Sequence, residues 1–501
     1  MARSADRAPL LGIALDPESD TPRHRQLYRA LRAAVLAGRL APGARLPSTR
    51  ALADELGCAR NTVVSAFEQL FAEGYLEGKV GSGTYVSRQL PETLLTAESK
   101  PAAWEPAPND TARSRRLSAR GQRLAALGLP RHRRPRAFNP GEPELAQFPF
   151  DTWARLLQRS WRAPGRDRLM HNPPGGDPAL RRAVAGHLNR VRGLDCTPEQ
   201  VLITGGAQQA LDIVARLLCD PGDRVWMEEP GYPGLRGALA AAGAVPVPVA
   251  MDGEGLSVAA GRALAPEARL AVVAPSHAYP LGTVMSLARR LTLLDWASEI
   301  GGWIVEDDYD SEYRYAGQPL AALAGLDRGR RTIYIGTFSK VLFPSLRVGY
   351  LVVPEDLADP MARARRGLDD HPGSTVQPAL AAFIEEGHFA QHLRRMRRLY
   401  AARQEALLEA GRRHLSGLLA LQPDVAGMHL VAGLDPALAA HADDRRCAHA
   451  ADAHGVAAPA LSGYYQGAPD RQGLLLGYAA VTETEIARAA HRLARALETL
   501  V

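Results

Sequence analysis

The chain has 501 residues, more than one ordinary hydrophobic core accommodates, so two or three domains are expected. Hydrophobic residues make up 46% and charged residues 23%, the balance of a soluble globular protein, and no stretch approaches the roughly 20 uninterrupted apolar residues of a membrane span. The net charge of +6 permits contact with nucleic acid but does not require it.

The N-terminal residues and the cysteines indicate the compartment. Residues 1–20 contain acidic side chains and no long apolar run, so we expect no signal peptide and a cytoplasmic protein. The four cysteines lie far apart and form no C-x-x-C pair. Reduced thiols are therefore expected, rather than a disulfide framework or a metal site.

Composition divides the chain into three zones. Residues 21–89 have compact helical patterning, and residues 137–501 alternate short apolar runs with longer helical segments. Residues 90–136 are rich in Pro, Ala, Ser and Arg without a sustained apolar period, which is the composition of a solvated linker. The arginines in its later half leave open a second role on DNA phosphates.

Two helices joined by a short turn are predicted in the first zone. After a helix with an apolar stripe that includes Leu27 and Leu31, Ser48 is placed to cap a short helix that Gly57 ends. A second helix begins near Asn61, and its inward face includes Phe67. Helix, turn and helix is the arrangement that lays a recognition helix in the major groove of DNA.

A glycine-rich β-hairpin is predicted to follow, over residues 75–86. Glycines at its tip let the backbone approach a sugar-phosphate edge closely. The run through 46–50, 74–76 and 81–86 resembles the GntR family of bacterial winged-helix regulators. The resemblance and the side-chain chemistry imply double-stranded DNA as partner, contacted by Ser48, Arg50, Arg60, Asn61, Thr62, Ser65, Gly81, Ser82 and Gly83.

The third zone predicts an α/β domain with a mostly parallel sheet. Buried strands are expected at 201–204, 270–273, 303–306, 332–335 and 350–353, with helical segments between most of them. Pyridoxal 5'-phosphate requires a lysine, an acidic partner for its ring nitrogen, an anion cradle and a flat ring contact. Each requirement has a candidate in this zone.

Lys340 is one of very few lysines in a chain rich in arginine, and it follows a predicted strand. Its amine can turn onto an aldehyde, with hydroxyl donors at Thr337 and Ser339 beside it. Arg347, seven residues on, can clamp a phosphate. Taken alone, Lys340 is equally consistent with a surface ammonium group.

Asp307 ends another strand, where it can hold the ring nitrogen, and Tyr309 can donate to the ring oxygen. Neighbouring acidic residues also leave a magnesium site open, although no nucleotide-phosphate loop accompanies them. Three residues at a helix start, Gly206, Ala207 and Gln208, form a candidate phosphate cradle. Tyr232 is the candidate for stacking on the ring.

In order and spacing these motifs resemble fold-type I aminotransferases over 138–501, which implies a large α/β sheet domain and a smaller C-terminal α+β subdomain. The whole chain resembles the MocR subfamily of GntR regulators. That resemblance implies a homodimer that binds pyridoxal phosphate, with Lys340 as the Schiff-base lysine. It also implies an effector, which is an amino acid, an amine or pyridoxal phosphate itself.

Two positions depart from the family pattern. Leu475 stands where aminotransferases carry an arginine for the substrate carboxylate, and His171 stands where a tyrosine is usual. Leucine cannot form the charge-assisted pair that holds a carboxylate. We therefore expect a PLP-dependent transcription regulator that senses its ligand, with half-reactions left open. The alternative is an active aminotransferase with an appended DNA-binding domain.

Overall fold

The computed structural model describes residues 13–79, 83–90, 117–127, 136–162, 169–170, 172–315 and 321–501. The chain forms two compact units, Met1–Arg115 and Arg116–Val501, with separate hydrophobic cores. This division falls inside the predicted linker, although the predicted limits of 21–89, 90–136 and 137–501 remain a prediction. Among the described residues, no helix combines the length and apolarity that crossing a membrane needs.

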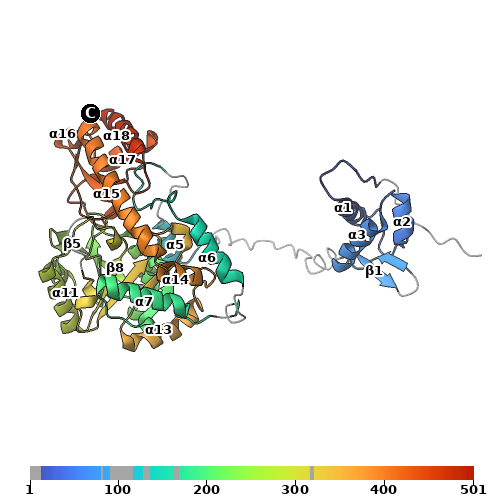
Figure 1. The fold of residues 1–501 in the computed structure, drawn as a ribbon, viewed down its shortest axis with the longest axis horizontal. Coiled ribbons are helices and arrows are strands. Elements are labelled where there is room, and N and C mark those ends of the chain that lie inside the picture. The colour runs from blue at the N-terminus through green and yellow to red at the C-terminus, as the bar shows by residue number, and fades with distance from the viewer. Residues whose placement is uncertain are drawn as a thin grey trace, which may run out of the picture. The chain divides into compact units, whose positions relative to one another are not determined.

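The first unit has the winged helix-turn-helix arrangement that the sequence predicts (Figure 1). Its elements are α1 (Arg23–Leu36), α2 (Thr49–Glu55), α3 (Arg60–Ala72), β1 (Leu76–Lys79) and β2 (Gly83–Val86). Ser48 caps α2, as predicted, because its hydroxyl accepts from the Ala51 N–H at 3.2 Å. Leu27 and Phe67 are buried between α1 and α3, so the recognition helix rests on a closed core.

An eight-stranded sheet forms the centre of the second unit, in the order β3-β10-β9-β8-β7-β4-β5-β6. Its strands are β3 (Val201–Thr204), β4 (Arg224–Glu229), β5 (Val245–Asp252), β6 (Gly255–Leu256), β7 (Leu270–Val273), β8 (Trp303–Asp308), β9 (Thr332–Thr337) and β10 (Gly349–Val352). Only β10 and β6 run antiparallel to their neighbours. The carboxyl ends of β3, β4, β7, β8 and β9 therefore lie along one edge.

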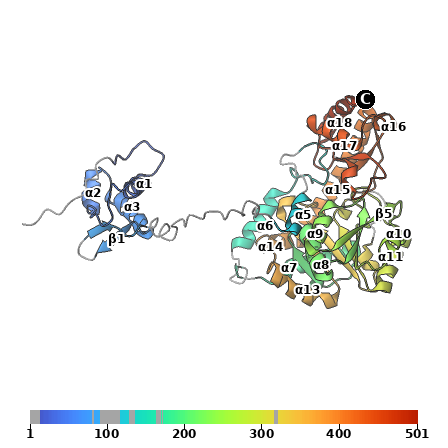
Figure 2. The same ribbon diagram turned by 180° about the vertical axis from the view of Figure 1, so that it is seen from behind.

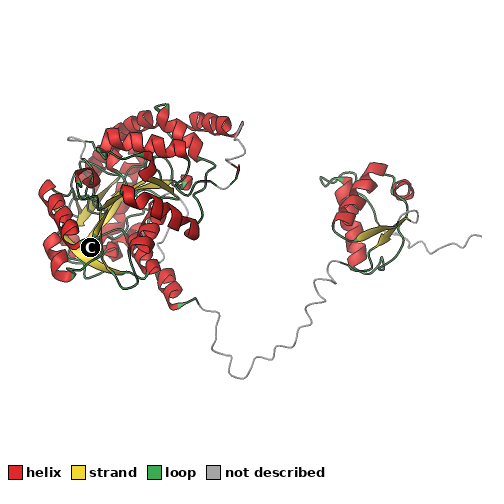
Figure 3. Ribbon diagram, turned by 90° about the horizontal axis from the view of Figure 1, so that it is seen from below, coloured by secondary structure: helices red, strands yellow, loops and turns green. Residues whose placement is uncertain are grey.

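Helices cover both sides of this sheet (Figure 3). They are α6 (Phe150–Arg162), α7 (Pro178–Arg192), α8 (Ala207–Leu218), α9 (Pro233–Ala242), α10 (Val258–Leu264), α11 (Leu287–Ile300), α12 (Leu323–Leu326), α13 (Glu355–Leu368) and α14 (Gln377–Glu385). Apolar clusters lie on both sides of the strands, because successive side chains of a strand point to opposite faces. This is the doubly covered α/β domain that the sequence predicts.

A smaller C-terminal part carries a second sheet. The long helix α15 (His388–His414) leads into it and packs against α18 (Glu483–Glu498) (Figures 1 and 2). Its antiparallel strands are β11 (Leu419–Leu421), β12 (His429–Leu434) and β13 (Gly473–Gly477), accompanied by α16 (Pro436–Ala439) and α17 (Asp444–Ala453). The predicted α+β subdomain is confirmed.

One helix lies inside the stretch that composition assigns to the linker. It is α5 (Ala119–Ala126), which Ser118 caps by accepting from the Gly121 N–H at 3.1 Å. The helix lies against α9, where the Arg120 guanidinium donates to the carbonyl of Ala241 (Figure 2). The prediction of a solvated linker does not hold for this helix, which is capped and lies against α9 with Leu124 half-buried.

Candidate functional site

The predicted cofactor residues converge at the edge where the parallel strands end. Gly206 follows β3, Tyr232 follows β4, Asp307 lies near the end of β8, and Lys340 follows β9. Arg347 precedes β10, whose first residue lies at the same edge because β10 runs the other way. Ligands of open α/β sheets bind at this edge, so the fold places all five residues where a ligand belongs.

Lys340 is one of three lysines in the chain. Its Nζ donates to the carbonyl oxygen of Gly141 at 2.8 Å. Gly141 has a φ of +74°, and a Cβ there would lie 2.8 Å from that Nζ. The glycine therefore leaves room for the amine at the edge of the sheet. The alternative of an isolated surface ammonium group is wrong, since Lys340 is half-buried in a polar contact.

Asp307 faces the opposite side of β8 from its neighbours Glu306 and Asp308, as strand alternation requires. Its Oδ1 is buried and accepts no hydrogen bond from the described residues. Burial, followed by the charges of Asp308 and Asp310, raises the pKa of Asp307 to about 7. A buried carboxyl oxygen without a donor is costly, so the Oδ1 position fits a ligand that brings an N–H group to it.

The adjacent acidic side chains are engaged elsewhere. Asp308 pairs with Arg192 at 2.9 Å, and Glu306 accepts from the backbone N–H groups of Leu323 and Ala324. Both carboxylates therefore serve the packing of β8 against α7 and α12. Glu306 and Asp308 thus have partners within the protein, whereas Oδ1 of Asp307 has none among the described residues. The order of these acidic residues in the sequence does not reveal this difference.

An anion cradle lies at the start of α8. Gly206, with a φ of +107°, precedes the helix, and Ala207 and Gln208 are its first residues. A Cβ on Gly206 would lie 3.4 Å from Nη1 of Arg347, so the guanidinium borders the helix N-terminus. The helix end and the guanidinium both favour a negative group between them.

Thr337 and Ser339 lie beside this cradle. The hydroxyl of Thr337 is buried and accepts from the Ser339 N–H at 3.2 Å. Thr337 therefore shapes the turn that leads from β9 to Lys340. The predicted donor roles of the two hydroxyls stay predictions.

Tyr232 is held by the first turn of α8. Its hydroxyl donates to Oε1 of Gln208 at 3.3 Å, while Nε2 of Gln208 donates to the carbonyl of Gly234 at 2.8 Å. A Cβ on Gly234 would lie 2.4 Å from the Tyr232 ring, which explains the glycine. Gln208 thus positions the tyrosine, a role that the sequence analysis did not assign to it.

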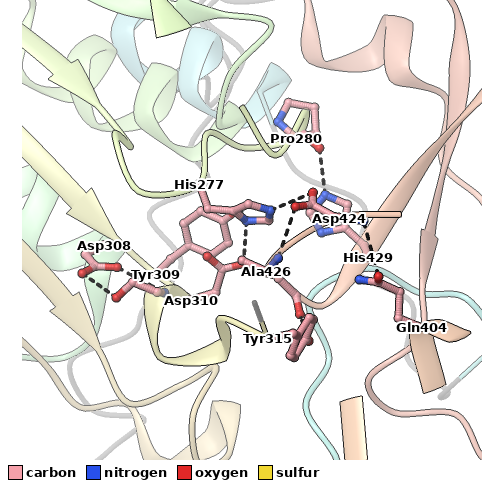
Figure 4. A network of polar contacts seen from close by, with 12 residues as sticks. His277, Pro280, Asp308, Tyr309, Asp310, Tyr315, Gln404, Asp424, Ala426 and His429 are labelled. Carbon is pink, nitrogen blue, oxygen red and sulfur yellow. Dashed lines mark hydrogen bonds and ion pairs between the residues drawn. The ribbon is translucent and has the colours of Figure 1, made fainter. Parts of the chain in front are cut away.

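A histidine network that the sequence analysis missed joins the two parts of the second unit (Figure 4). Nδ1 of His277 lies 3.0 Å from Asp310 and 3.1 Å from the Tyr309 hydroxyl, and Nε2 lies 3.1 Å from Asp424. Asp310 follows β8, whereas Asp424 belongs to the C-terminal part. Gly282 leaves room for the network, since a Cβ there would lie 2.2 Å from Asp424.

The charge of this network follows from its carboxylates. Burial acts to lower the pKa of His277, but Asp310 and then Asp424 outweigh it and raise the pKa to about 10. The imidazole is therefore a cation at neutral pH. Burial, and next the charge of Asp310, raises the pKa of Tyr309 well above its usual value, so its hydroxyl stays protonated.

The predicted DNA-contact residues lie on the surface of the first unit. Ser48, Arg50, Arg60, Asn61 and Ser65 are exposed, and Thr62 is half-exposed. Nε of Arg60 donates to the Thr49 hydroxyl at 3.3 Å, which links α3 to α2. Gly81 and Ser82, like His171 of the second unit, lie outside the described residues.

Arg45 is a further cation at the hairpin. Its Nε would lie 3.2 Å from a Cβ on Gly83, whose φ is +117°. The guanidinium therefore sits beside the wing strand, next to the predicted DNA contacts. Arg45 is not among the predicted DNA contacts, although it directly precedes the Leu46–Arg50 run in the sequence.

Two family descriptions match the chain, one in each of its two units. Residues 23–86 match "Bacterial regulatory proteins, gntR family", and residues 138–493 match "Aminotransferase class I and II". It is 46% identical to the probable rhizopine catabolism regulatory protein MocR of Rhizobium meliloti, over 94% of this chain and 92% of that protein. The chain belongs to the MocR subfamily of GntR transcription regulators.

Two further comparisons are with a second regulator and with a solved aminotransferase. It is 33% identical to the pyridoxine biosynthesis transcriptional regulator PdxR of Corynebacterium glutamicum, over 93% of this chain and 94% of that protein. Its second unit is similar to the solved α-aminoadipate aminotransferase LysN of Thermus thermophilus, complexed with N-(5'-phosphopyridoxyl)-L-leucine. That match has a TM-score of 0.66 and 29% identity, and it covers 76% of this chain and 95% of the enzyme.

The position of the missing arginine is closed in this regulator. Leu475 is 0% exposed and packs in an apolar cluster with Leu461 and Tyr465. Two other arginines can be compared with this position. Arg471 is exposed and pairs with Asp470 at 3.5 Å. Arg236 donates through Nη2 to the carbonyl of Tyr464 at 2.7 Å, and its buried Nε has no hydrogen-bond partner among the described residues.

Proposed function

We propose that the protein is a DNA-binding transcription regulator that holds pyridoxal 5'-phosphate in its second unit and senses a small amino compound, or the cofactor itself, there. The observation that carries the proposal is the buried Oδ1 of Asp307, which lacks a donor at the edge where Lys340 and Arg347 converge. An exposed recognition helix in the same chain supports a DNA-linked role.

The residues present fit the cofactor. Asp307 would accept from the ring nitrogen, Tyr232 would stack on the ring, and the start of α8 with Arg347 would hold the phosphate. Lys340 would bind the aldehyde carbon through its amine. When bound, the cofactor supplies an electrophilic carbonyl that reacts with amines.

Tyr309 and its neighbours would set the protonation of the site. The cationic His277, at 3.1 Å, holds the Tyr309 hydroxyl in place while Asp310 balances the charge. A protonated hydroxyl at this position can donate to an oxygen of a bound ligand. Asp424 ties this arrangement to the C-terminal part, so a movement of that part would change the contacts of His277 that hold the Tyr309 hydroxyl.

The helix α5 offers a route from the site toward the DNA-binding unit. It is the described segment closest in sequence to the first unit, and it docks on α9. The same α9 begins directly after Tyr232 and carries Arg236. Ligand binding that shifts α9 would therefore change the docking of α5, and docked and released α5 would be the two states that an allosteric switch requires. The expected assembly is a cytoplasmic homodimer on double-stranded DNA.

The cofactor part is tested by the visible absorption spectrum of the purified full chain with pyridoxal phosphate, before and after sodium borohydride. We expect a visible band that borohydride abolishes in the wild type. Lys340→Ala should lack the band, and Arg347→Ala should show it only at higher cofactor concentration. A chain that shows no band at saturating cofactor refutes the cofactor proposal.

The DNA part is tested by footprinting on the regions upstream of its own gene and its neighbours. A protected site that disappears in Asn61→Ala is the expected result, and a duplex of shuffled sequence serves as the control. Absence of any protected site would refute the regulator proposal. Steady turnover of an amino donor with a keto acid would instead favour the alternative of an active aminotransferase, whose cofactor-binding residues are all present.

A further inference from the structure

We infer that Gln209 is a positioning residue for the phosphate cradle at the start of α8, and that Arg365 and Asp369 hold the Gln209 amide in place. The inference rests on the proposed function, because the cradle is where we propose that the cofactor phosphate binds. It adds three side chains that act on the phosphate through the backbone of the cradle rather than by direct contact.

The side-chain amide of Gln209 bridges two segments of the second unit. Its Oε1 accepts from the backbone N–H of Gly205 at 2.5 Å, and its Nε2 donates to Oδ2 of Asp369 at 2.6 Å. Gly205 lies in the turn between β3 and α8, whereas Asp369 directly follows α13. The amide therefore holds the Gly205 peptide in a fixed position relative to the end of α13.

This contact decides which N–H groups of the turn remain for a ligand. The Gly205 N–H is taken by the Gln209 amide. The Thr204 hydroxyl donates to the carbonyl of Gly206 at 3.1 Å, so the turn is closed from within. The first N–H groups of a helix have no acceptor inside the helix. Those at the start of α8 are therefore left to meet an anion, in the orientation that the turn gives them.

Arg365 anchors the other end of this arrangement. It is 0% exposed, and its guanidinium forms a bidentate pair with Asp369, at 2.9 Å through Nε and 3.1 Å through Nη2. Its Nη1 also donates to the carbonyl of Ile203, on β3, and to that of Pro174 at 3.3 Å. A single buried side chain thus ties the strand that leads into the cradle to the residue that holds the Gln209 amide.

These three side chains act by position rather than by charge. Asp369 pairs with Arg365, so the two charges balance each other. The cation that borders the cradle is Arg347, since a Cβ on Gly206 would lie 3.4 Å from its Nη1. A phosphate would take its charged partner from Arg347 and its backbone donors from the turn that Gln209 fixes. Loss of the Gln209 amide would therefore leave the charged partner and release the turn.

The variant Gln209→Met tests the inference in the full chain, because methionine keeps the length and the helix preference of glutamine and removes both hydrogen bonds. Pyridoxal phosphate and pyridoxal, which lacks the phosphate, are each titrated against the visible band. We expect Gln209→Met to bind pyridoxal phosphate about tenfold more weakly, with its affinity for pyridoxal within about twofold of the wild type. A general structural role of Gln209 would weaken both ligands alike.

Inorganic phosphate supplies a second readout, as a competitor of pyridoxal phosphate in the same titration. Its inhibition constant should rise about tenfold in Gln209→Met. Gln158→Met is the matched control, because Gln158 is exposed on α6, and it should change neither readout. Asp369→Asn should shift both readouts in the same direction as Gln209→Met, since asparagine keeps only one of the two oxygens that Arg365 and Gln209 use. This second variant decides the matter if Gln209→Met does not fold.

The outcomes separate the inference from the proposed function. Equal weakening of pyridoxal phosphate and pyridoxal, or an unchanged inhibition constant for inorganic phosphate, overturns the role of Gln209 while the cofactor proposal still stands. A wild type that shows no visible band at saturating pyridoxal phosphate fails the proposed function before this comparison begins.

Discussion

Replacing His277 by glutamine is the sharpest test of the network that joins the two parts of the second unit. The imidazole is 2% exposed, and its nitrogens lie between the carboxylates of Asp310 and Asp424 at 3.0 and 3.1 Å. Glutamine removes the cation and leaves Asp310 as a buried anion. Loss of one partner of a buried ion pair costs about 3–5 kcal/mol of unfolding free energy.

The pH dependence of this cost has a definite sign. The pKa of His277 rises from its unfolded value of about 6.5 to about 10 in the folded protein. The folded state therefore binds the proton more tightly, so the stabilisation is fully present below pH 6.5 and is lost as the pH rises toward 10. By linkage the wild type should lose about 3 kcal/mol relative to His277→Gln between pH 6.5 and 9.5.

Urea denaturation followed by tryptophan fluorescence measures this difference. Five of the six tryptophans lie in the second unit, between residues 153 and 303, and the sixth is Trp104, so most of the emission reports the second unit. His441→Gln is the matched control, because His441 is exposed. A stability difference between wild type and His277→Gln that stays constant across this pH range would refute the reasoning.

Three further changes test other parts of the molecule. Asp307→Asn should weaken pyridoxal phosphate binding about 10- to 100-fold in an equilibrium absorbance titration, because it removes a charge-assisted hydrogen bond. Arg60→Ala should weaken binding to the DNA site by about 10- to 100-fold in fluorescence anisotropy, and unchanged affinity would remove Arg60 from the interface. Gly261→Ala should cost about 1–3 kcal/mol in urea, because its Cβ would lie 2.8 Å from the Trp226 ring. Gly367→Ala, in a helix with open space around it, should not destabilise, and a similar loss in both variants would contradict this account.

Local patterns predicted much of the fold. The strands β3, β7, β8, β9 and β10 are short apolar runs between turn residues, and each forms where the pattern places it. Two strands are not among the predicted ones: β4, whose ends are charged, and β5, which contains Pro246 and Pro248. Prolines and charges weaken a strand pattern, yet pairing with β4 and β6 keeps β5 extended.

The candidate site, like the fold, could be predicted from the sequence only in part. Lys340 and Gly206 each follow a strand and Asp307 lies near the end of β8, so their meeting follows from a parallel sheet. The His277 network could not be predicted, because Asp310 and Asp424 lie 33 and 147 residues away from it in the chain. No local spacing encodes such a contact, since only the docking of the C-terminal part on the sheet brings Asp424 to the imidazole.

The two sides of the candidate site come from different parts of the chain. A lysine, a buried carboxylate oxygen without a donor and the predicted anion cradle lie at the edge of the large sheet, at Lys340, Asp307 and Gly206. The C-terminal part contributes Asp424, whose carboxylate lies 3.1 Å from Nε2 of His277. Because Nδ1 of His277 also lies 3.1 Å from the Tyr309 hydroxyl, a movement of the C-terminal part would reach the residues that we propose hold the cofactor. The proposed sensor could therefore respond to its ligand through the C-terminal part while the cofactor residues of the sheet stay in place.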